Sequence, residues 1–190
     1  MPDAQAGKSP ASWSRIARRI RVPLGFAFAA LYLWRAKPTW LSLSVGTTVA
    51  LLGILLRAIA SGHVEKNRML TVTGPYAYVR NPLYLGSIII GVGFTIAARD
   101  AWIFLAIILL FAVIYLPVIR SEEAFLRMQF REYDDYARRV PSLLPDTLLL
   151  RQIMSGFSRE LYFKHHEYNS LLGAAAMLAA LVVKILWFPG

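Results

Sequence analysis

Long, mainly apolar runs constrain this chain more than any other feature. It has 190 residues, of which 57% are hydrophobic and 17% are charged. A helix needs about 20 mainly apolar residues to cross a bilayer, and several runs approach or reach that length. They cover residues 22–34, 40–60, 83–98, 101–119 and 171–188. Because a membrane segment must satisfy its own backbone hydrogen bonds, we expect an all-α integral membrane protein with about five transmembrane helices.

The runs and the polar stretches between them suggest one membrane domain over residues 1–190. Within it, 1–62 hold the N-terminal membrane segments, 63–145 the polar motifs, and 146–190 an interfacial segment and the last transmembrane helix. The run at 22–34 is short and follows a basic stretch. We expect an uncleaved membrane segment there, which either spans the bilayer or lies shallowly in it.

The basic residues indicate orientation rather than nucleic-acid binding. The formal net charge is +10, but the Lys and Arg residues flank the apolar runs instead of forming one soluble patch. If the N-terminus, residues 61–82 and residues 120–169 share one side, 16 of the 21 Lys and Arg lie there, four lie on the other side, and Arg57 lies within the second run. The positive-inside rule makes that side cytoplasmic. The pattern requires a lipid bilayer and gives no sign of a required protein partner.

A polar turn with two prolines lies at residues 73–86, between the second and third runs. A proline keeps the residue before it out of the helical region, so Asn81 is predicted to cap the next helix and Pro82 to be its first residue. The unpaired amides of a helix start favour an anion. The sequence therefore predicts an anion site beside Arg80 at the membrane surface.

The third and fourth runs should form a hairpin, because only Arg99 and Asp100 separate them. Two spans of similar length, up and back, return the chain to the face that it left. Arg80 and the acidic doublet Glu122-Glu123 should therefore line one pocket. In the second run, Gly46 and Gly53 allow close contact with another helix.

Residues 122–140 have the apolar spacing of one amphipathic helix, which Pro141 and Pro145 end. Asp134 and Arg138 are four residues apart in the favourable order for a helical ion pair. Pro117, near the end of the fourth run, is expected to kink that helix. We thus expect loops and this amphipathic helix to build the pocket.

Three motifs follow one another between His63 and Pro145. They are Gly74-Pro75-Tyr76-x-x-x-Arg80-Asn81-Pro82-x-Tyr84-x-Gly86, then Glu122-Glu123, then Glu132-Tyr133-x-x-Tyr136 leading to Val140-Pro141 and Leu144-Pro145. Together they resemble the isoprenylcysteine carboxyl methyltransferase and phospholipid methyltransferase superfamily. The resemblance implies an integral membrane enzyme that takes S-adenosylmethionine from the cytosol. The family usually has histidine where this chain has Asn81.

The groups of that cofactor suit particular side chains of the motifs. Arg80 and the first amides of the third span suit its carboxylate, either acidic residue of the doublet suits its ammonium, and aromatic ring faces suit its sulfonium. The candidate cofactor-binding residues are His63, Gly74, Tyr76, Arg80, Asn81, Pro82, Tyr84, Glu122, Glu123 and Tyr133. The candidate catalytic residues are Arg80, Glu123 and Arg151, the last as an orienting group for an anionic substrate.

The function expected from these features is methyl transfer from S-adenosylmethionine to a lipophilic, membrane-embedded acceptor, such as the carboxylate or headgroup of an isoprenoid or lipid-like molecule. A phospholipid amine, or a small hydrophobic thiol or acid, stays open as an alternative acceptor. A transporter or a non-catalytic membrane scaffold are the competing classes, although the interiors of the third and fourth spans lack the charges typical of a transporter. His165-His166-Glu167 does not have the usual zinc-binding spacing, so no metal is assigned.

Overall fold

The computed structural model describes residues 25–65, 69–145 and 157–187. The chain divides into two compact units, Met1–Arg35 and Ala36–Gly190. In the first unit, residues 25–35 are helical, which covers part of the predicted 22–34 membrane segment. Every regular element in the described residues is a helix, so the expected all-α class is confirmed.

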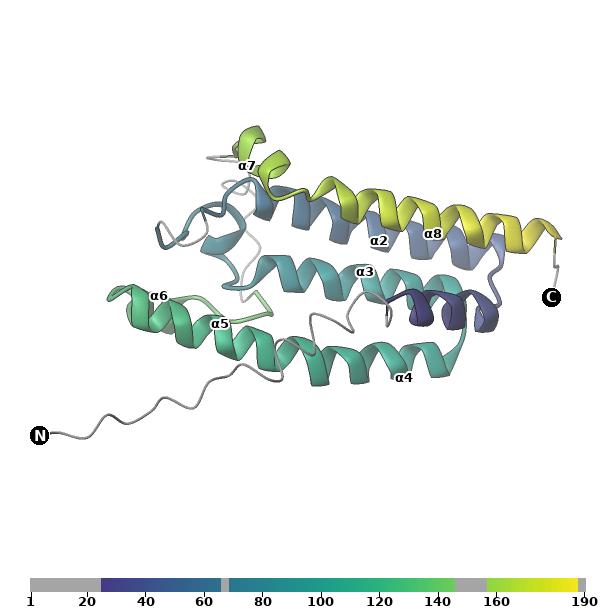
Figure 1. Ribbon diagram of the computed structural model, residues 1–190, viewed down its shortest axis with the longest axis horizontal. Helices are drawn as coiled ribbons and strands as arrows, with labels where there is room; N and C mark the ends of the chain where they lie inside the picture. Colours follow the sequence, from purple (N-terminus) through teal and green to yellow (C-terminus); the bar gives the residue numbers. More distant parts are fainter. Residues whose placement is uncertain (1–24, 66–68, 146–156, 188–190) are drawn as a thin grey trace, which may run out of the picture. The chain divides into compact units, whose positions relative to one another are not determined.

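The second unit contains the remaining helices (Figure 1). They are α2 (Trp40–Ser61), η1 (Gly74–Ala77), α3 (Pro82–Ala98), α4 (Ala101–Leu110), the π-helical turn η2 (Phe111–Tyr115), α5 (Leu116–Gln129), α6 (Tyr133–Arg139), α7 (Arg159–Lys164) and α8 (Tyr168–Trp187). Three helices are long and apolar enough to cross a membrane: α2, the continuous helix Ala101–Gln129, and α8. The apolar helix α3 is shorter.

Glycines bring α2 and α3 into close contact, as expected for Gly46 and Gly53. A Cβ atom on Gly46 would lie 2.5 Å from the Gly93 carbonyl oxygen, and one on Gly53 would lie 2.6 Å from that of Gly86. The converse also holds, because a Cβ on Gly93 would lie 2.6 Å from the Gly46 oxygen. Both pairs are seven residues apart on their helices, so each helix presents one stripe without side chains to its antiparallel partner.

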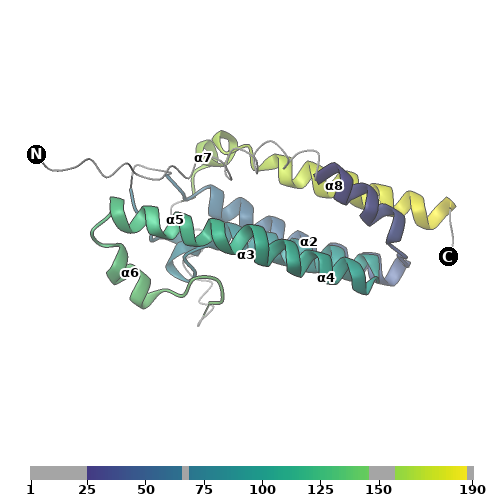
Figure 2. The same cartoon turned by 60° about the horizontal axis from the view of Figure 1, so that its bottom comes forward.

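The predicted hairpin is present, and its turn is two residues long. Helix α3 ends at Ala98, and its C-cap residue Arg99 adopts the left-handed conformation at φ 52°. Asp100 then caps α4, because its carboxylate accepts hydrogen bonds from the amides of Trp102 and Ile103 at 2.9 and 3.0 Å. Figure 2 shows the long helix of α4 and α5 running beside α3 from this turn.

The fourth helix is longer than the sequence predicted, because it continues past residue 119 to Gln129. Pro117 has no amide hydrogen to donate to the preceding turn. The hydrogen-bond register shifts to a π-helical turn at Phe111–Tyr115, just before the proline, and the helix resumes as α5. Glu122 and Glu123 therefore lie on the helix that leaves the membrane, not on a separate element.

The prediction of a single amphipathic helix over residues 122–140 is wrong. Helix α5 ends at Gln129, Phe130 is extended at φ −123° and ψ 118°, and α6 starts at Tyr133. Because the chain breaks here, Asp134 pairs with Arg127 on α5 at 2.8 Å and not with Arg138 as expected. Both helices have the same apolar spacing, so periodicity alone could not reveal the break.

Candidate active site

The polar turn is built around Gly74, the first residue of η1. Its φ of +58° is a conformation that side-chain-bearing residues rarely adopt. A Cβ atom on Gly74 would also overlap the imidazole of His63, which is buried at the end of α2. The Nδ1 atom of His63 lies 2.8 Å from the Ile59 carbonyl oxygen and donates to it, because a carbonyl can only accept. His63 and Gly74 thus fix each other.

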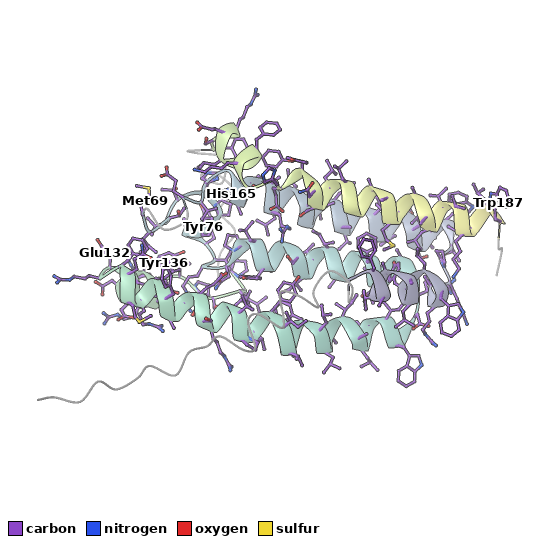
Figure 3. All side chains as sticks on the ribbon, viewed as in Figure 1. Met69, Tyr76, Glu132, Tyr136, His165 and Trp187 are labelled. Carbon is purple, nitrogen blue, oxygen red and sulfur yellow. The ribbon has the colours of Figure 1, made fainter. Side chains whose placement is uncertain are left out.

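The turn is held from the other side by α6. The Tyr136 hydroxyl donates a buried hydrogen bond of 2.7 Å to the Tyr76 carbonyl oxygen. The rings of Tyr133 and Tyr136 meet edge to face at 6.0 Å between centroids, and both side chains are buried. The paired tyrosines therefore dock α6 onto the motif. Figure 3 shows Tyr76 and Tyr136 at the same end of the helices, opposite Trp187.

Carbonyl groups of the extended chain after α6 accept hydrogen bonds from backbone amides of the turn. The Arg80 amide donates to the Pro141 carbonyl at 2.9 Å, and the Asn81 amide donates to the Ser142 carbonyl at 3.1 Å. The amides of Tyr84 and Leu85 both donate to the Asn81 carbonyl. These four amides are committed to protein carbonyls, so the anion site expected from unpaired amides rests on the Arg80 side chain instead.

The hairpin brings Arg80 and Glu123 together, as its geometry predicted. One Glu123 carboxylate oxygen, Oε2, lies 3.4 Å from Arg80 Nη1. The other, Oε1, accepts hydrogen bonds from Asn81 Nδ2 and Ser142 Oγ, both at 2.8 Å. The side chains of Arg80 and Glu123 are each 14% exposed. We call Arg80, Asn81, Glu123 and Ser142 the polar cluster.

Asn81 stands at the N-cap position of α3, as predicted, but its side chain does not cap the helix. Its amide nitrogen instead donates to Glu123 and to the carbonyl and hydroxyl oxygens of Ser142, the latter two at 3.2 and 3.1 Å. An amide can make these bonds without carrying charge. Asn81 therefore ties α3 to α5 and to the chain that follows α6.

The buried guanidinium of Arg80 has N–H groups that are not fully used in hydrogen bonds. Its Nη1 lies 3.5 Å from the Tyr133 hydroxyl. Its Nε is the one buried side-chain polar atom in the described residues without a hydrogen-bond partner. Leaving such a group unsatisfied costs about 1–3 kcal/mol, and a bound carboxylate would relieve that cost. The donor set thus fits the cofactor that the motifs imply.

The two acidic residues of the doublet have different environments. Glu123 is engaged in the polar cluster, whereas Glu122 is exposed. Burial raises the pKa of the Tyr76 hydroxyl well above its usual range, and the charges of Tyr136 and Glu122 raise it further. Burial likewise raises the pKa of Tyr133 and of Tyr136. These phenols therefore stay neutral at physiological pH; the Glu122 charge acts on Tyr76, and the Glu123 charge acts on Tyr133 and Tyr136.

The remaining candidate residues are placed as follows. Pro82 is buried as the first residue of α3. The Tyr84 ring meets Tyr115 of the π-helical turn edge to face at 5.6 Å, inside the hairpin. Arg151 lies outside the described residues. Ser142 was not predicted, since its partners lie 19 and 61 residues away along the chain and no local pattern marks them.

A second buried charge pair was also missed. Arg57, in the last turns of α2, pairs with Glu167, the residue before α8, with 2.5 Å between Nε and Oε1. The signal was present in the sequence, because an ionisable residue inside an apolar run is a functional candidate by default. Across the parts of the chain that the structure describes, no group of three or more His, Asp or Glu side chains suits a metal ion. The metal-free assignment stays a prediction.

Comparison with known proteins supports the resemblance. The family model for phospholipid methyltransferases matches residues 40–133. A probable protein-S-isoprenylcysteine O-methyltransferase of Oryza sativa subsp. indica is 31% identical over 129 residues, which are 61% of this chain and 68% of the relative. The residues that the family model matches include the polar turn and the acidic doublet.

Two bacterial relatives carry names from metal resistance. A nickel-cobalt-cadmium resistance protein of Alcaligenes xylosoxydans xylosoxydans is 36% identical over 121 residues, 60% of this chain. A cobalt-zinc-cadmium resistance protein of Cupriavidus metallidurans is 32% identical over 141 residues, 69% of this chain. The chain spans 55% and 64% of the lengths of these two relatives. No solved structure matches the chain.

Proposed function

Because the chain belongs to the isoprenylcysteine carboxyl methyltransferase and phospholipid methyltransferase superfamily, we propose that it methylates a lipophilic acceptor held in the membrane, with S-adenosylmethionine as the donor. The observation that carries the proposal is the polar cluster at the open end of the α3–α4 hairpin. There a buried arginine, Arg80, retains an unpartnered Nε beside Glu123.

Each acidic residue has its own role in this proposal. Glu123 accepts from Asn81, Ser142 and Arg80, so its carboxylate anchors Arg80 in position. Arg80 in turn would bind the carboxylate of the cofactor. Glu122 is exposed, so it is the carboxylate available for an ammonium group. The bound cofactor would supply an electrophilic methyl group on a positively charged sulfur.

The chain's own contribution is mainly positioning. Methyl transfer requires the acceptor to be held in line with the methyl group. A carboxylate acceptor is already ionised and needs no base, whereas an amine acceptor must give up a proton, which Glu122 could take. The neutral faces of Tyr76 and Tyr133 suit a nearby positive charge. The apolar helices on which the cluster stands would admit the acceptor from the bilayer.

The acceptor class is proposed from the relatives' names and from the setting. The rice relative is named for a prenylated cysteine, and the family description names phospholipids. Both are lipophilic molecules that reside in the bilayer. The basic flanks of the membrane segments favour a cytoplasmic position for the cluster and for the N-terminus.

Calorimetry of S-adenosylmethionine binding to the detergent-solubilised chain tests the proposal. We expect the wild type to bind and Arg80→Ala to bind at least about tenfold more weakly, because a charge-assisted hydrogen bond contributes about 1.5–3 kcal/mol. Glu122→Ala should also weaken binding. Arg131→Ala is the matched control, since Arg131 is an exposed arginine in the same region. No binding by the wild type, or equal binding by all variants, would refute the proposal.

The acceptor can be found directly. Membranes that contain the chain would be incubated with methyl-labelled cofactor, and the labelled product identified by mass spectrometry. We expect a lipid or a prenylated species that is absent with Arg80→Ala. A water-soluble labelled product would contradict the lipophilic acceptor while leaving methyl transfer intact.

The names of two relatives also raise a physiological role in metal resistance. Growth of cells carrying the wild type or Arg80→Ala, on media with nickel, cobalt or cadmium, tests whether the polar cluster serves that role. Equal growth of both strains would separate resistance from this site.

A further inference from the structure

The C-terminal segment, which we define as residues 157–167, contacts the end of α2 although it lies outside the family-matched residues 40–133. The Ser158 amide donates to the Gly62 carbonyl at 2.8 Å. His165 Nδ1 donates to the Ser61 carbonyl at 3.1 Å. Figure 3 shows His165 at the same end of the helices as Tyr76.

The C-terminal segment also packs on a candidate site residue. The Phe157 ring meets the His63 imidazole edge to face, with 6.1 Å between centroids. The same ring occupies the space where a Cβ atom on Gly62 would lie. Since the His63 ring packs directly on Gly74, an unbroken series of contacts joins the C-terminal segment to the first residue of the motif.

The Arg57–Glu167 ion pair attaches the end of this segment to the helices below. Arg57 Nη1 donates to Ser87 Oγ at 2.5 Å and to the Leu83 carbonyl at 3.2 Å. Leu83 lies in the first turn of α3, directly after Asn81 and Pro82. One arginine on α2 therefore holds both the start of α3 and the end of the C-terminal segment.

The ion pair is shielded from water and close to the site. The side chains of Arg57 and Glu167 are only 22% and 9% exposed, and Ser170 Oγ adds a hydrogen bond of 3.0 Å to the Glu167 carboxylate. A buried pair of this kind is costly to break, because the remaining charge is left without its partner. The charges of Glu167 and Arg57 both reach the Tyr76 hydroxyl, which belongs to the motif.

We propose that the C-terminal segment is a fixed part of the active site, and that Arg57 and Glu167 are positioning residues that hold it against His63 and Gly74. The part of this inference that concerns cofactor binding rests on the proposed function. It assigns a role in cofactor binding to a part of the chain that the family match does not reach.

Two measurements on the same variants test the proposal. The chain has no cysteines, so Arg138→Cys and Lys164→Cys, both exposed, can carry a pair of spin labels that report the distance between α6 and the C-terminal segment. Calorimetry gives the Kd for S-adenosylmethionine. Both are applied to wild type, to Glu167→Gln, and to Glu160→Gln as a control for the same change at an exposed position of that segment.

We expect Glu167→Gln to broaden the distance distribution and to raise the Kd at least tenfold, while Glu160→Gln changes neither. Phe157→Ala, which keeps all charges, should raise the Kd in the same direction and serves if Glu167→Gln does not fold. A broadened distribution with an unchanged Kd would overturn the role in binding. An unchanged distribution would overturn the positioning role of the ion pair.

Failure of the proposed function gives a different pattern. If the wild type does not bind S-adenosylmethionine, the binding claim falls together with the proposed function. The spin-label distances still decide whether Glu167 holds the C-terminal segment in place, because that measurement needs no cofactor.

Discussion

The adjacent residues Glu122 and Glu123 allow a sharp test of the polar cluster, because the same substitution should have very different effects at the two positions. Glu123→Gln keeps the size of the side chain and retains an oxygen that can accept from Asn81 and Ser142. It removes the charge that lies 3.4 Å from Arg80 Nη1. Glu122→Gln makes the same change on an exposed side chain.

The magnitude follows from the burial of the Arg80–Glu123 pair. Removing one partner of a buried ion pair costs about 3–5 kcal/mol. Both side chains are 14% exposed and the contact is long, so solvent screening reduces the cost. We expect Glu123→Gln to lower the free energy of unfolding by about 2 kcal/mol, roughly a 30-fold change in the ratio of folded to unfolded chain. An exposed substitution such as Glu122→Gln should change it by less than about 0.5 kcal/mol.

Denaturant titration of both variants in one detergent, followed by tryptophan fluorescence, measures the difference. The comparison is internal, since the two variants differ from each other only in position. Equal midpoints for the two variants, or a lower midpoint for Glu122→Gln, would refute the assignment of Glu123 as the buried anchor of Arg80.

Three further outcomes are expected. Gly53→Leu should unfold the α2–α3 pair or lower its melting temperature strongly, because the Gly86 carbonyl lies where the side chain would go. Gly173→Leu is the control and should not have this effect, because no atom lies within 4 Å of the Gly173 Cβ position. Similar melting temperatures for the two variants would count against the glycine contact. Tyr136→Phe should cost about 1–3 kcal/mol in the same unfolding assay, since it leaves the buried Tyr76 carbonyl without its donor; no loss would show that water replaces the hydroxyl. Burial raises the pKa of the Tyr76 and Tyr136 hydroxyls. The stability that comes from keeping these two phenols protonated in the folded chain is therefore complete below pH about 10 and falls as the pH rises above it. Tyrosinate absorbance for Tyr136 that appears below pH 10, read as the difference from Tyr136→Phe, would contradict the burial.

Local chain geometry made the centre of the site predictable. Two residues, Arg99 and Asp100, leave room for nothing but a tight turn, so the two apolar runs had to return side by side. That constraint alone placed Arg80 near the acidic doublet, 42 residues further along the chain. The prolines and glycines of the turn likewise fixed where α3 begins.

Side-chain partners that no tight turn of the chain brings together could not be predicted. The Asn81 side-chain oxygen had a local role available as a helix cap, yet the side chain is placed by its nitrogen, which donates to the Glu123 carboxylate and to Ser142. Helix α5 continues where a boundary was expected, since an emerging span and an amphipathic helix share one periodicity. The Arg57–Glu167 pair joins residues 110 positions apart, and no local pattern links them.

Photo-crosslinking with methyl-labelled S-adenosylmethionine, followed by mass spectrometry of the labelled peptides, tests the central claim most directly. If the hairpin brings the turn and the acidic doublet into one cofactor site, the label should appear on peptides that contain Tyr76 or Tyr133, and Arg80→Ala should abolish it. Labelling confined to other peptides, or labelling that Arg80→Ala leaves unchanged, would contradict a cofactor site at the polar cluster.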